Sequence, residues 1–146
     1  MAVDAVPEGF HTITPYLVAA DAAGLILFLQ ASFAAEEVHR VTREDGSVMH
    51  AQLRIGSSML MLGGATADWP PMAAGLYLYV EDADALYQRA LSEGATTVMP
   101  PADQFWGDRM AGVRDAWDNV WWIATHIEDV APDELSRRAA AAMQAD

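Results

Sequence analysis

Histidines are the side chains of this chain best suited to transfer protons at physiological pH, and they could also bind a metal ion. The histidines are His11, His39, His50 and His126. They lack the short spacings typical of metal-binding motifs, and the neighbouring pair Glu36 and Glu37 does not complete such a motif with His39. Cysteine is absent, which excludes a thiolate nucleophile, a sulfur-ligated metal and a disulfide framework.

His50 is the candidate for acid–base catalysis. It lies in the segment Val48–Leu53, which has the alternating pattern of a strand. The ordinary pKa of an imidazole is close to physiological pH, so His50 could act as a general base or hydrogen-bond a ligand. A structural histidine that is simply hydrogen-bonded within the fold is the alternative interpretation.

A second group of candidates lies in the segment Gln104–Arg109. Its polar side chains are those of Gln104, Asp108 and Arg109. Trp106 stands among them in a turn region, where an indole is not needed for core packing, and this favours contact with a ligand. Asp108 and Arg109 either contact the same ligand or pair with other loop residues.

Composition limits the possible partners. The net charge is −13, with 21 acidic residues and eight arginines, and such a surface repels nucleic acid. The acidity either keeps the protein soluble or attracts a cationic small molecule. Apolar residues make up 53% of the chain, but no apolar run approaches the roughly 20 residues of a membrane span. The N-terminus lacks the pattern of a signal peptide, so we expect a cytoplasmic protein without a membrane partner.

Hydrophobic periodicity divides the chain into two similar halves. The first half predicts a strand, a helix capped by Asp21, and three further strands. The predicted strands are Thr12–Val18, Glu37–Thr42, Val48–Ile55 and Ser58–Leu62, and the apolar face of the helix comprises Leu25, Phe28, Leu29 and Phe33. The run from Gly63 to Pro71 then predicts an irregular connection, in which Trp69 either contacts a ligand or anchors the loop.

The second half repeats the same order of elements. The predicted strands are Leu76–Val80, Thr96–Met99, Arg109–Arg114 and Val120–Thr125, and the helix, capped by Asp82, presents Leu86, Ala90 and Leu91. Tyr-Leu-Val-Ala-Ala-Asp before the first helix and Leu-Tyr-Val-Glu-Asp before the second indicate an internal duplication. A separate helix is predicted from Pro132 to about Met143.

Three phrases near the C-terminus resemble a known family. Gln104–Arg109, the pair Arg114-Asp115 and Trp121–His126 are similar to the last two strands of a glyoxalase/bleomycin-resistance module of the vicinal oxygen chelate superfamily, closest to its PhnB-like subgroup. The resemblance implies an α+β fold in which two β-α-β-β-β modules form a curved mixed-sheet cup. It implies one domain over residues 1–130, with modules at about 12–62 and 75–126, a helical tail over 131–146, and a homodimer.

The resemblance also implies where metal ligands would stand. The four positions carried over from metalloenzyme members fall at Thr14, Met61, Gly75 and Trp122. None is a histidine or a carboxylate, and a thioether or an indole cannot replace those ligands around a divalent cation. We therefore expect neither a metal ion nor another cofactor.

One departure from the family pattern concerns the turn before the last strand. The family usually has Pro and Gly there, whereas this chain has Asp115-Ala-Trp-Asp-Asn119. Without glycine, Asp118 or Asn119 must adopt the turn conformation. The pair Arg114-Asp115 is expected to have a structural role.

Strand alternation assigns an aromatic and methionine-rich lining to the cup, which suits flat, partly apolar ligands. The side chains could instead fill the cup themselves or close it at a dimer interface. We predict a metal-free small-molecule binding protein whose aromatic cup holds an apolar or aromatic ligand, which could also be cationic. The predicted ligand-binding residues are Tyr16, Met59, Met61, Tyr77, Tyr79, Gln104, Trp106, Arg109 and Trp122. The alternatives are a lyase, isomerase or dioxygenase, with His50 as the catalytic residue of a metal-free isomerase, and a regulatory partner.

Overall fold

The computed structural model describes residues 2–145, which form two compact units. The first unit, called the first module below, comprises the chain up to Ala74 together with Ala116–Asp118. The second module comprises Gly75–Asp115 and the chain from Asn119 onwards. Each module contains one four-stranded mixed sheet.

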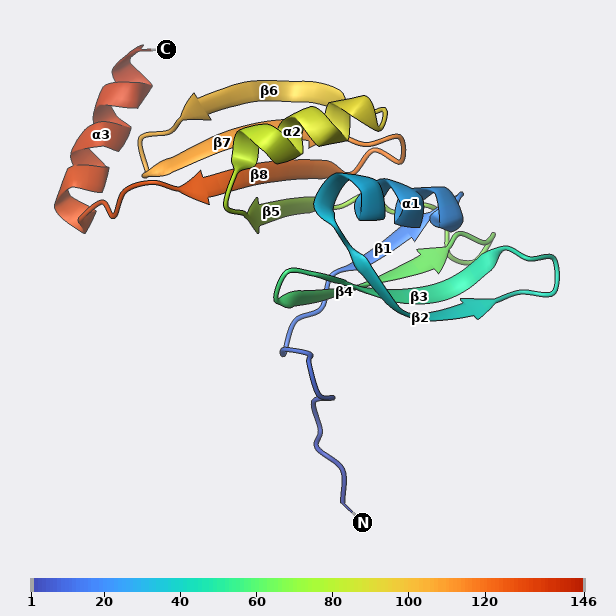
Figure 1. Ribbon diagram of the computed structural model, residues 1–146. Coiled ribbons are helices and arrows are strands. Elements are labelled where there is room, and N and C mark those ends of the chain that lie inside the picture. The colour runs from blue at the N-terminus through green and yellow to red at the C-terminus, as the bar shows by residue number, and fades with distance from the viewer. Residues whose placement is uncertain (1, 146) are drawn as a thin grey trace. The chain divides into compact units, whose positions relative to one another are not determined.

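The first module consists of one helix on a four-stranded sheet. Its elements are β1 (Tyr16–Ala19), α1 (Ala22–Phe33), β2 (Glu36–Thr42), β3 (Val48–Ile55) and β4 (Ser58–Gly64). The strands lie in the order β1-β4-β3-β2, and only the β1–β4 pair is parallel. α1 covers one face of this sheet (Figure 1).

The second module repeats this topology, as the internal duplication predicts. Its elements are β5 (Gly75–Tyr79), α2 (Ala83–Ser92), β6 (Thr96–Asp103), β7 (Asp108–Arg114), β8 (Val120–His126) and the additional α3 (Pro132–Ala145). The order is β5-β8-β7-β6, with β5 parallel to β8 and the other pairs antiparallel. The predicted α+β class, the β-α-β-β-β order and the C-terminal helix are confirmed.

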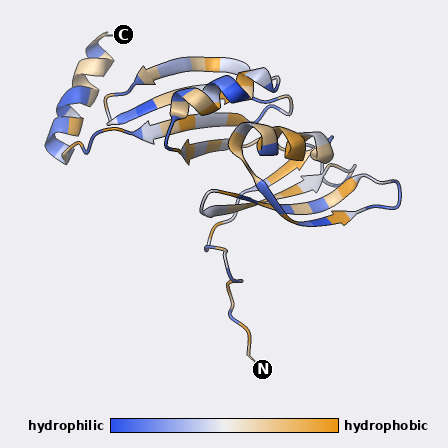
Figure 2. Ribbon diagram, in the orientation of Figure 1, coloured by the Kyte–Doolittle hydropathy of each residue, from blue (hydrophilic) through white to orange (hydrophobic). Residues whose placement is uncertain are grey.

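Helix α1 begins and packs as its sequence predicts. The Asp21 carboxylate accepts a hydrogen bond from the Gly24 backbone N–H at 3.0 Å, which satisfies one of the amides left free at a helix N-terminus. The predicted apolar face is buried. Its buried members include Leu25, Phe28, Leu29 and Phe33. Figure 2 shows α1 as predominantly apolar, whereas α3 is mixed in polarity.

Helix α2 packs through a face shifted from the predicted one. Its buried residues are Ala83, Tyr87 and Ala90, whereas Leu86 and Leu91 are only partly buried. The Tyr87 hydroxyl lies 2.7 Å from the Thr97 hydroxyl, so the ring is buried with its polar end satisfied. The Asp82 cap is confirmed by the bond from the Ala85 N–H.

Several strand limits differ from the predicted ones by one residue, and three strands differ by more: β6, which continues to Asp103 instead of ending at Met99, β1 and β4. β1 begins at Tyr16, not at Thr12, and the preceding Pro15 has no N–H to donate to a ladder. β4 continues through Gly64, because Gly63 and Gly64 pair with β1 instead of opening the connecting loop. The loop after them returns to the edge of β1, where Met72 exchanges backbone hydrogen bonds with Val18.

The turn without proline and glycine is held by a buried carboxylate. Asp118 adopts the left-handed conformation, with φ 69°, which confirms one of the two predicted positions. Asp115 accepts hydrogen bonds from the Asn119 backbone N–H, the Asn119 side chain and the Trp121 indole. These bonds fix the turn, and the predicted structural role of this region follows from them.

None of the helices in residues 2–145 is long and apolar enough to cross a membrane. α3 has no buried residue, and Arg138 attaches it to the rest of the second module. The guanidinium of Arg138 donates to the Glu128 carboxylate and, at 3.3 Å, to the Phe105 carbonyl.

Candidate functional site

The first module has an open sheet face opposite α1. Leu17, Ala51 and Leu62 are buried on the α1 side, whereas their strand neighbours point to the other side. Tyr16 pairs with Met61 in the register, and Gly63 pairs with His50. Tyr16 and Val18 of β1, and Met61 and Gly63 of β4, are therefore on the open face at positions two apart in sequence, as the alternation predicts. The alternation is interrupted near Met49, where the pairing of β2 with β3 shifts its register.

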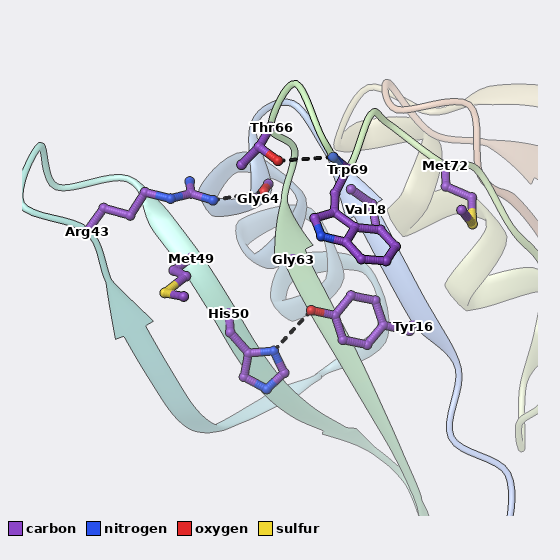
Figure 3. A pocket seen from close by; sticks show the side chains of 10 residues that line it. All are labelled: Tyr16, Val18, Arg43, Met49, His50, Gly63, Gly64, Thr66, Trp69 and Met72. Carbon is purple, nitrogen blue, oxygen red and sulfur yellow. Dashed lines mark hydrogen bonds between the residues drawn. The ribbon is translucent and has the colours of Figure 1, made fainter.

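A pocket of about 720 Å³ lies over this face (Figure 3). It is lined by Tyr16, Val18, Arg43, Met49, His50, Gly63, Gly64, Thr66, Trp69 and Met72. The large apolar members are unusually exposed: the exposed fraction is 68% for Trp69, 57% for Met72 and 54% for Met49. The pocket thus presents a wide apolar surface to solvent within one module.

Tyr16 and His50 form the polar pair of this pocket. Their rings stack with centroids 5.8 Å apart, and a hydrogen bond of 3.3 Å joins the Tyr16 hydroxyl to Nδ1 of His50. Gly63 makes room for the tyrosine, because a Cβ there would lie 2.8 Å from the Tyr16 hydroxyl oxygen. Figure 3 shows the two side chains directed toward one another across β4.

Arg43 closes one end of the pocket. Its guanidinium donates to the Val48 carbonyl at 3.1 Å and to the Gly64 carbonyl at 2.9 Å, so it ties the β2–β3 turn to the end of β4. Among the described residues that line the pocket, Arg43 is the only arginine or lysine, and none is an aspartate or a glutamate. Sequence reasoning did not identify this residue, because its contact depends on the return of β4 past the turn.

A compact loop holds Trp69 at the pocket. The Trp69 N–H donates to the Thr66 hydroxyl at 3.0 Å, and the Thr66 N–H donates to the Trp69 carbonyl at 2.8 Å. These bonds fix the backbone on which the exposed indole stands. The sequence also did not predict Met49 and Met72 as pocket residues. Met72 reaches β1 from a loop that has no periodic pattern.

The second module carries a different cluster at the ends of β5, β7 and β8. The Asp108 side chain is 1% exposed and accepts four hydrogen bonds. Its Oδ2 atom accepts three of them: from the Tyr77 hydroxyl at 2.7 Å, the Tyr79 hydroxyl at 3.0 Å and the Trp106 indole N–H at 3.1 Å. His126 Nδ1 lies 2.8 Å from Oδ1. Three predicted ligand-binding aromatics thus surround one carboxylate.

His126 bridges two carboxylates. Its Nδ1 faces Asp108, and its Nε2 lies 2.7 Å from the fully exposed Asp129. A carboxylate can only accept, so both ring nitrogens donate when both bonds are formed, and the ring is then the imidazolium. Hydrogen bonds to Asp108 and then to Asp129 raise the pKa of His126, in agreement with this geometry.

The cluster holds Asp108 in its charged form. Burial of the carboxylate is the largest single influence and opposes ionisation, but the bonds from His126, Tyr77, Tyr79 and Trp106 together outweigh it and lower the pKa of Asp108. Burial, followed by the bond to Asp108, raises the pKa of the Tyr77 hydroxyl to about 12. Tyr77 therefore remains a neutral donor at physiological pH.

The remaining predicted residues lie in several environments. Gln104 is in the β6–β7 turn, where its N–H donates to the Asp108 carbonyl. Arg109 is on the α2 side of its sheet, because it is one residue beyond Asp108, and it pairs with Asp84 and Asp103. Met59 is buried. Trp122 lies over Gly75 and Gly112, where an added Cβ would meet its ring.

The positions at which the family resemblance places metal ligands do not fit a divalent cation. Thr14 precedes β1, Gly75 has no side chain, and the thioether of Met61 and the indole of Trp122 are unsuitable donors. Among residues 2–145 no group of three or more histidines and carboxylates is arranged to hold a metal ion. Asp108 and Asp129 bind opposite nitrogens of His126 and so do not converge on one point.

A comparison with protein families identifies one superfamily for this chain. The model of the glyoxalase/bleomycin resistance protein/dioxygenase superfamily matches residues 9–123. An uncharacterized protein of Mycobacterium bovis is 37% identical over 148 residues, covering 92% of this chain and 94% of that protein. An uncharacterized protein of Mycobacterium tuberculosis is also 37% identical, covering 92% of this chain and 84% of the relative.

Solved structures share the fold at low sequence identity. TioX from Micromonospora sp. ML1 superposes with a TM-score of 0.67 and 23% identity, over 80% of this chain and 99% of that one. The PhnB protein from Bacillus cereus gives 0.61 and 16%, over 79% and 99%. The fosfomycin resistance protein FosX from Listeria monocytogenes, solved with Mn(II) and sulfate, gives 0.61 and 14%, over 88% and 97%.

Proposed function

Because the chain belongs to the glyoxalase/bleomycin resistance protein/dioxygenase superfamily, we propose that it is a metal-independent binding protein for an apolar or aromatic small molecule. The observation that supports this most directly is the pocket over the open face of the first module. Its volume of about 720 Å³ falls within the range of roughly 300–1,000 Å³ of small-molecule sites. The fold alone does not determine the function, since it serves several chemistries.

The lining of the pocket suits a flat, partly apolar ligand. Trp69 and Tyr16 offer ring faces, and the thioethers of Met49 and Met72 adapt to the outline of a ligand. The few polar groups are suited to orienting a ligand, with His50 and Tyr16 at one side and Arg43 at one end. The side chains at the family's metal positions, Met61 and Trp122 among them, support binding without a metal ion.

Tryptophan fluorescence tests this proposal. We expect at least one member of a panel of planar aromatic antibiotics to quench the protein's fluorescence saturably. Trp69→Leu should weaken its binding by about three- to tenfold, the value of an aromatic contact. The matched control is Leu27→Ala, which changes an exposed apolar side chain on α1. Lack of saturation by every compound, or equal binding by Trp69→Leu and the native protein, would contradict the proposal.

A metal-free isomerase is the second candidate function, and the Tyr16–His50 pair favours it. The hydrogen bond to Nδ1 fixes the imidazole beside an apolar pocket, as a general base requires. If this candidate is right, His50→Gln will abolish turnover but will still bind the aromatic substrate. A metal-dependent lyase is tested separately, by metal analysis of the purified protein and a glyoxalase assay with glutathione and methylglyoxal.

Homodimerisation is also part of the proposal, as the family relationship suggests. Light scattering after size-exclusion chromatography measures it: a mass of twice 15.8 kDa supports the dimer, and a mass of 15.8 kDa rejects it.

A further inference from the structure

The aromatic cluster around Asp108 is not used by the proposed pocket, which lies entirely in the first module. Asp108 is buried and charged, and a buried carboxylate normally needs compensation by cations or by several donors. Here three of its four donors are aromatic side chains, from Tyr77, Tyr79 and Trp106. The polar ends of three aromatic side chains thus converge on one negative charge.

These aromatic side chains remain accessible. Tyr79 is 66% exposed, and Tyr77 and Trp106 are partly exposed. The two tyrosine rings lie with centroids 5.3 Å apart and planes at 54°. Three further contacts hold the arrangement. The Trp106 indole also donates to the Tyr77 hydroxyl at 3.2 Å, Phe105 packs edge-on against Trp106, and the His126 ring lies edge-on to Tyr79 with centroids 6.5 Å apart. The surface therefore presents three fixed aromatic side chains whose polar ends meet at a buried carboxylate.

The charges around this surface favour a positive ligand. Asp108 and Asp129 carry two negative charges, and the imidazolium of His126 offsets only one of them. Arg109 adds no positive charge here, because it lies on the α2 side of the sheet in ion pairs with Asp84 and Asp103. The whole chain has a net charge of −13, which raises the local concentration of cations.

We propose that Tyr77, Tyr79 and Trp106, with Asp108 beneath them, form a binding site for the alkylammonium group of an organic cation. The negative face of an aromatic ring attracts a cation, and a phenol that donates to a carboxylate is polarised in the direction that strengthens this attraction. The site goes beyond the proposed function: it lies in the other module and recognises charge, whereas the first-module pocket recognises flat apolar groups.

Choline and 3,3-dimethylbutan-1-ol provide the test, because they share a shape and differ in charge. The Trp106 indole N–H resonance reports binding, since this group donates to Asp108. We expect choline to shift it saturably and to bind at least threefold more tightly than the neutral alcohol, as a cation–π contact predicts. Added salt should weaken only choline binding.

Two variants at one exposed position separate the ring from the hydroxyl. Tyr79→Leu removes the ring and should weaken choline binding about three- to tenfold, whereas Tyr79→Phe keeps the ring and should stay within about twofold of the native protein. The folding of both is checked by circular dichroism, and the exposure of Tyr79 favours a folded product. Trp69→Leu, in the first-module pocket, should leave choline binding unchanged.

Equal affinity for choline and the alcohol would overturn this inference, as would native choline binding by Tyr79→Leu. Neither result affects the first-module pocket, because the antibiotic titration and its Trp69→Leu variant measure that site separately. Conversely, if no antibiotic of the panel bound, the choline titration would still test the second-module site. The two proposals can therefore fail independently.

Discussion

Asp108 is the acceptor that the aromatic cluster of the second module shares, with four hydrogen bonds to its carboxylate. Asp108→Ala should lower the free energy of unfolding by about 2–4 kcal/mol, because Tyr77, Trp106 and His126 lose a buried acceptor. Asp103→Ala is the matched control: this side chain is exposed, and its ion pair with Arg109 is worth at most about 1 kcal/mol. Urea unfolding of both variants measures the difference, and equal losses would contradict the role given to Asp108.

The stability of the native protein should also depend on the protonation of His126. Its pKa in the folded protein is raised above the ordinary value of 6.5, first by the bond to Asp108. The contribution of protonated His126 to stability is therefore complete below the pKa of this residue in the unfolded chain. It is lost as the pH rises through the pKa of His126 in the folded protein. An NMR titration of the His126 ring should give a pKa above 6.5, and His126→Gln should remove the corresponding loss of stability. A pKa at or below 6.5 would show that the bridge between Asp108 and Asp129 does not form.

At the residue scale, strand alternation predicted part of the site. It placed Tyr77, Tyr79 and Trp122 on one side of their sheet, and the register confirms that Tyr77 pairs with Trp122. It did not separate Asp108 from Arg109, because the strand was predicted to begin at Arg109. With β7 beginning at Asp108, the two side chains must point to opposite faces. A limit wrong by one residue thus hid the buried carboxylate.

At the element scale, the end of α1 is a position where the sequence is suboptimal. Ala34 adopts the left-handed conformation with φ 55°, which is costly for a residue with a Cβ. Ala34→Gly should therefore raise the free energy of unfolding by about 1 kcal/mol, whereas Ala31→Gly, the same exchange inside the helix, should lower it by about 1 kcal/mol. Thermal unfolding distinguishes the two, and a loss of stability in both would contradict the structure of this helix end.

The limits of helices and strands were predictable from the sequence wherever they depend only on neighbouring residues. Asp21 and Asp82 capped their helices as predicted, because an N-cap needs only the neighbouring amides. Gly63 was assigned to a loop on composition, yet it lies in β4, where the absence of a side chain accommodates the Tyr16 ring. Such a glycine has a packing reason that depends on a residue far away in sequence.

At the scale of the whole molecule, the internal duplication gives both modules the same topology, but the two modules carry different clusters of functional side chains. The two sheets have the same strand order, and Tyr16 and Tyr77 occupy equivalent positions relative to the capping residues Asp21 and Asp82. Tyr16 is joined to His50, whereas Tyr77 is joined to Asp108. The repeat is visible in the sequence, but the partners of each tyrosine come from strands whose sequences have diverged.

The central claim is that the first module binds a flat, apolar ligand over Trp69. The most direct measurement follows the tryptophan indole N–H resonances in a ¹⁵N NMR titration with a planar aromatic antibiotic. Trp69 is 68% exposed at the pocket, whereas Trp121 is buried and its indole N–H donates to Asp115. We predict a saturable shift of the Trp69 resonance, with the Trp121 resonance unchanged. Saturable binding that shifts other indoles and leaves Trp69 unmoved would contradict it.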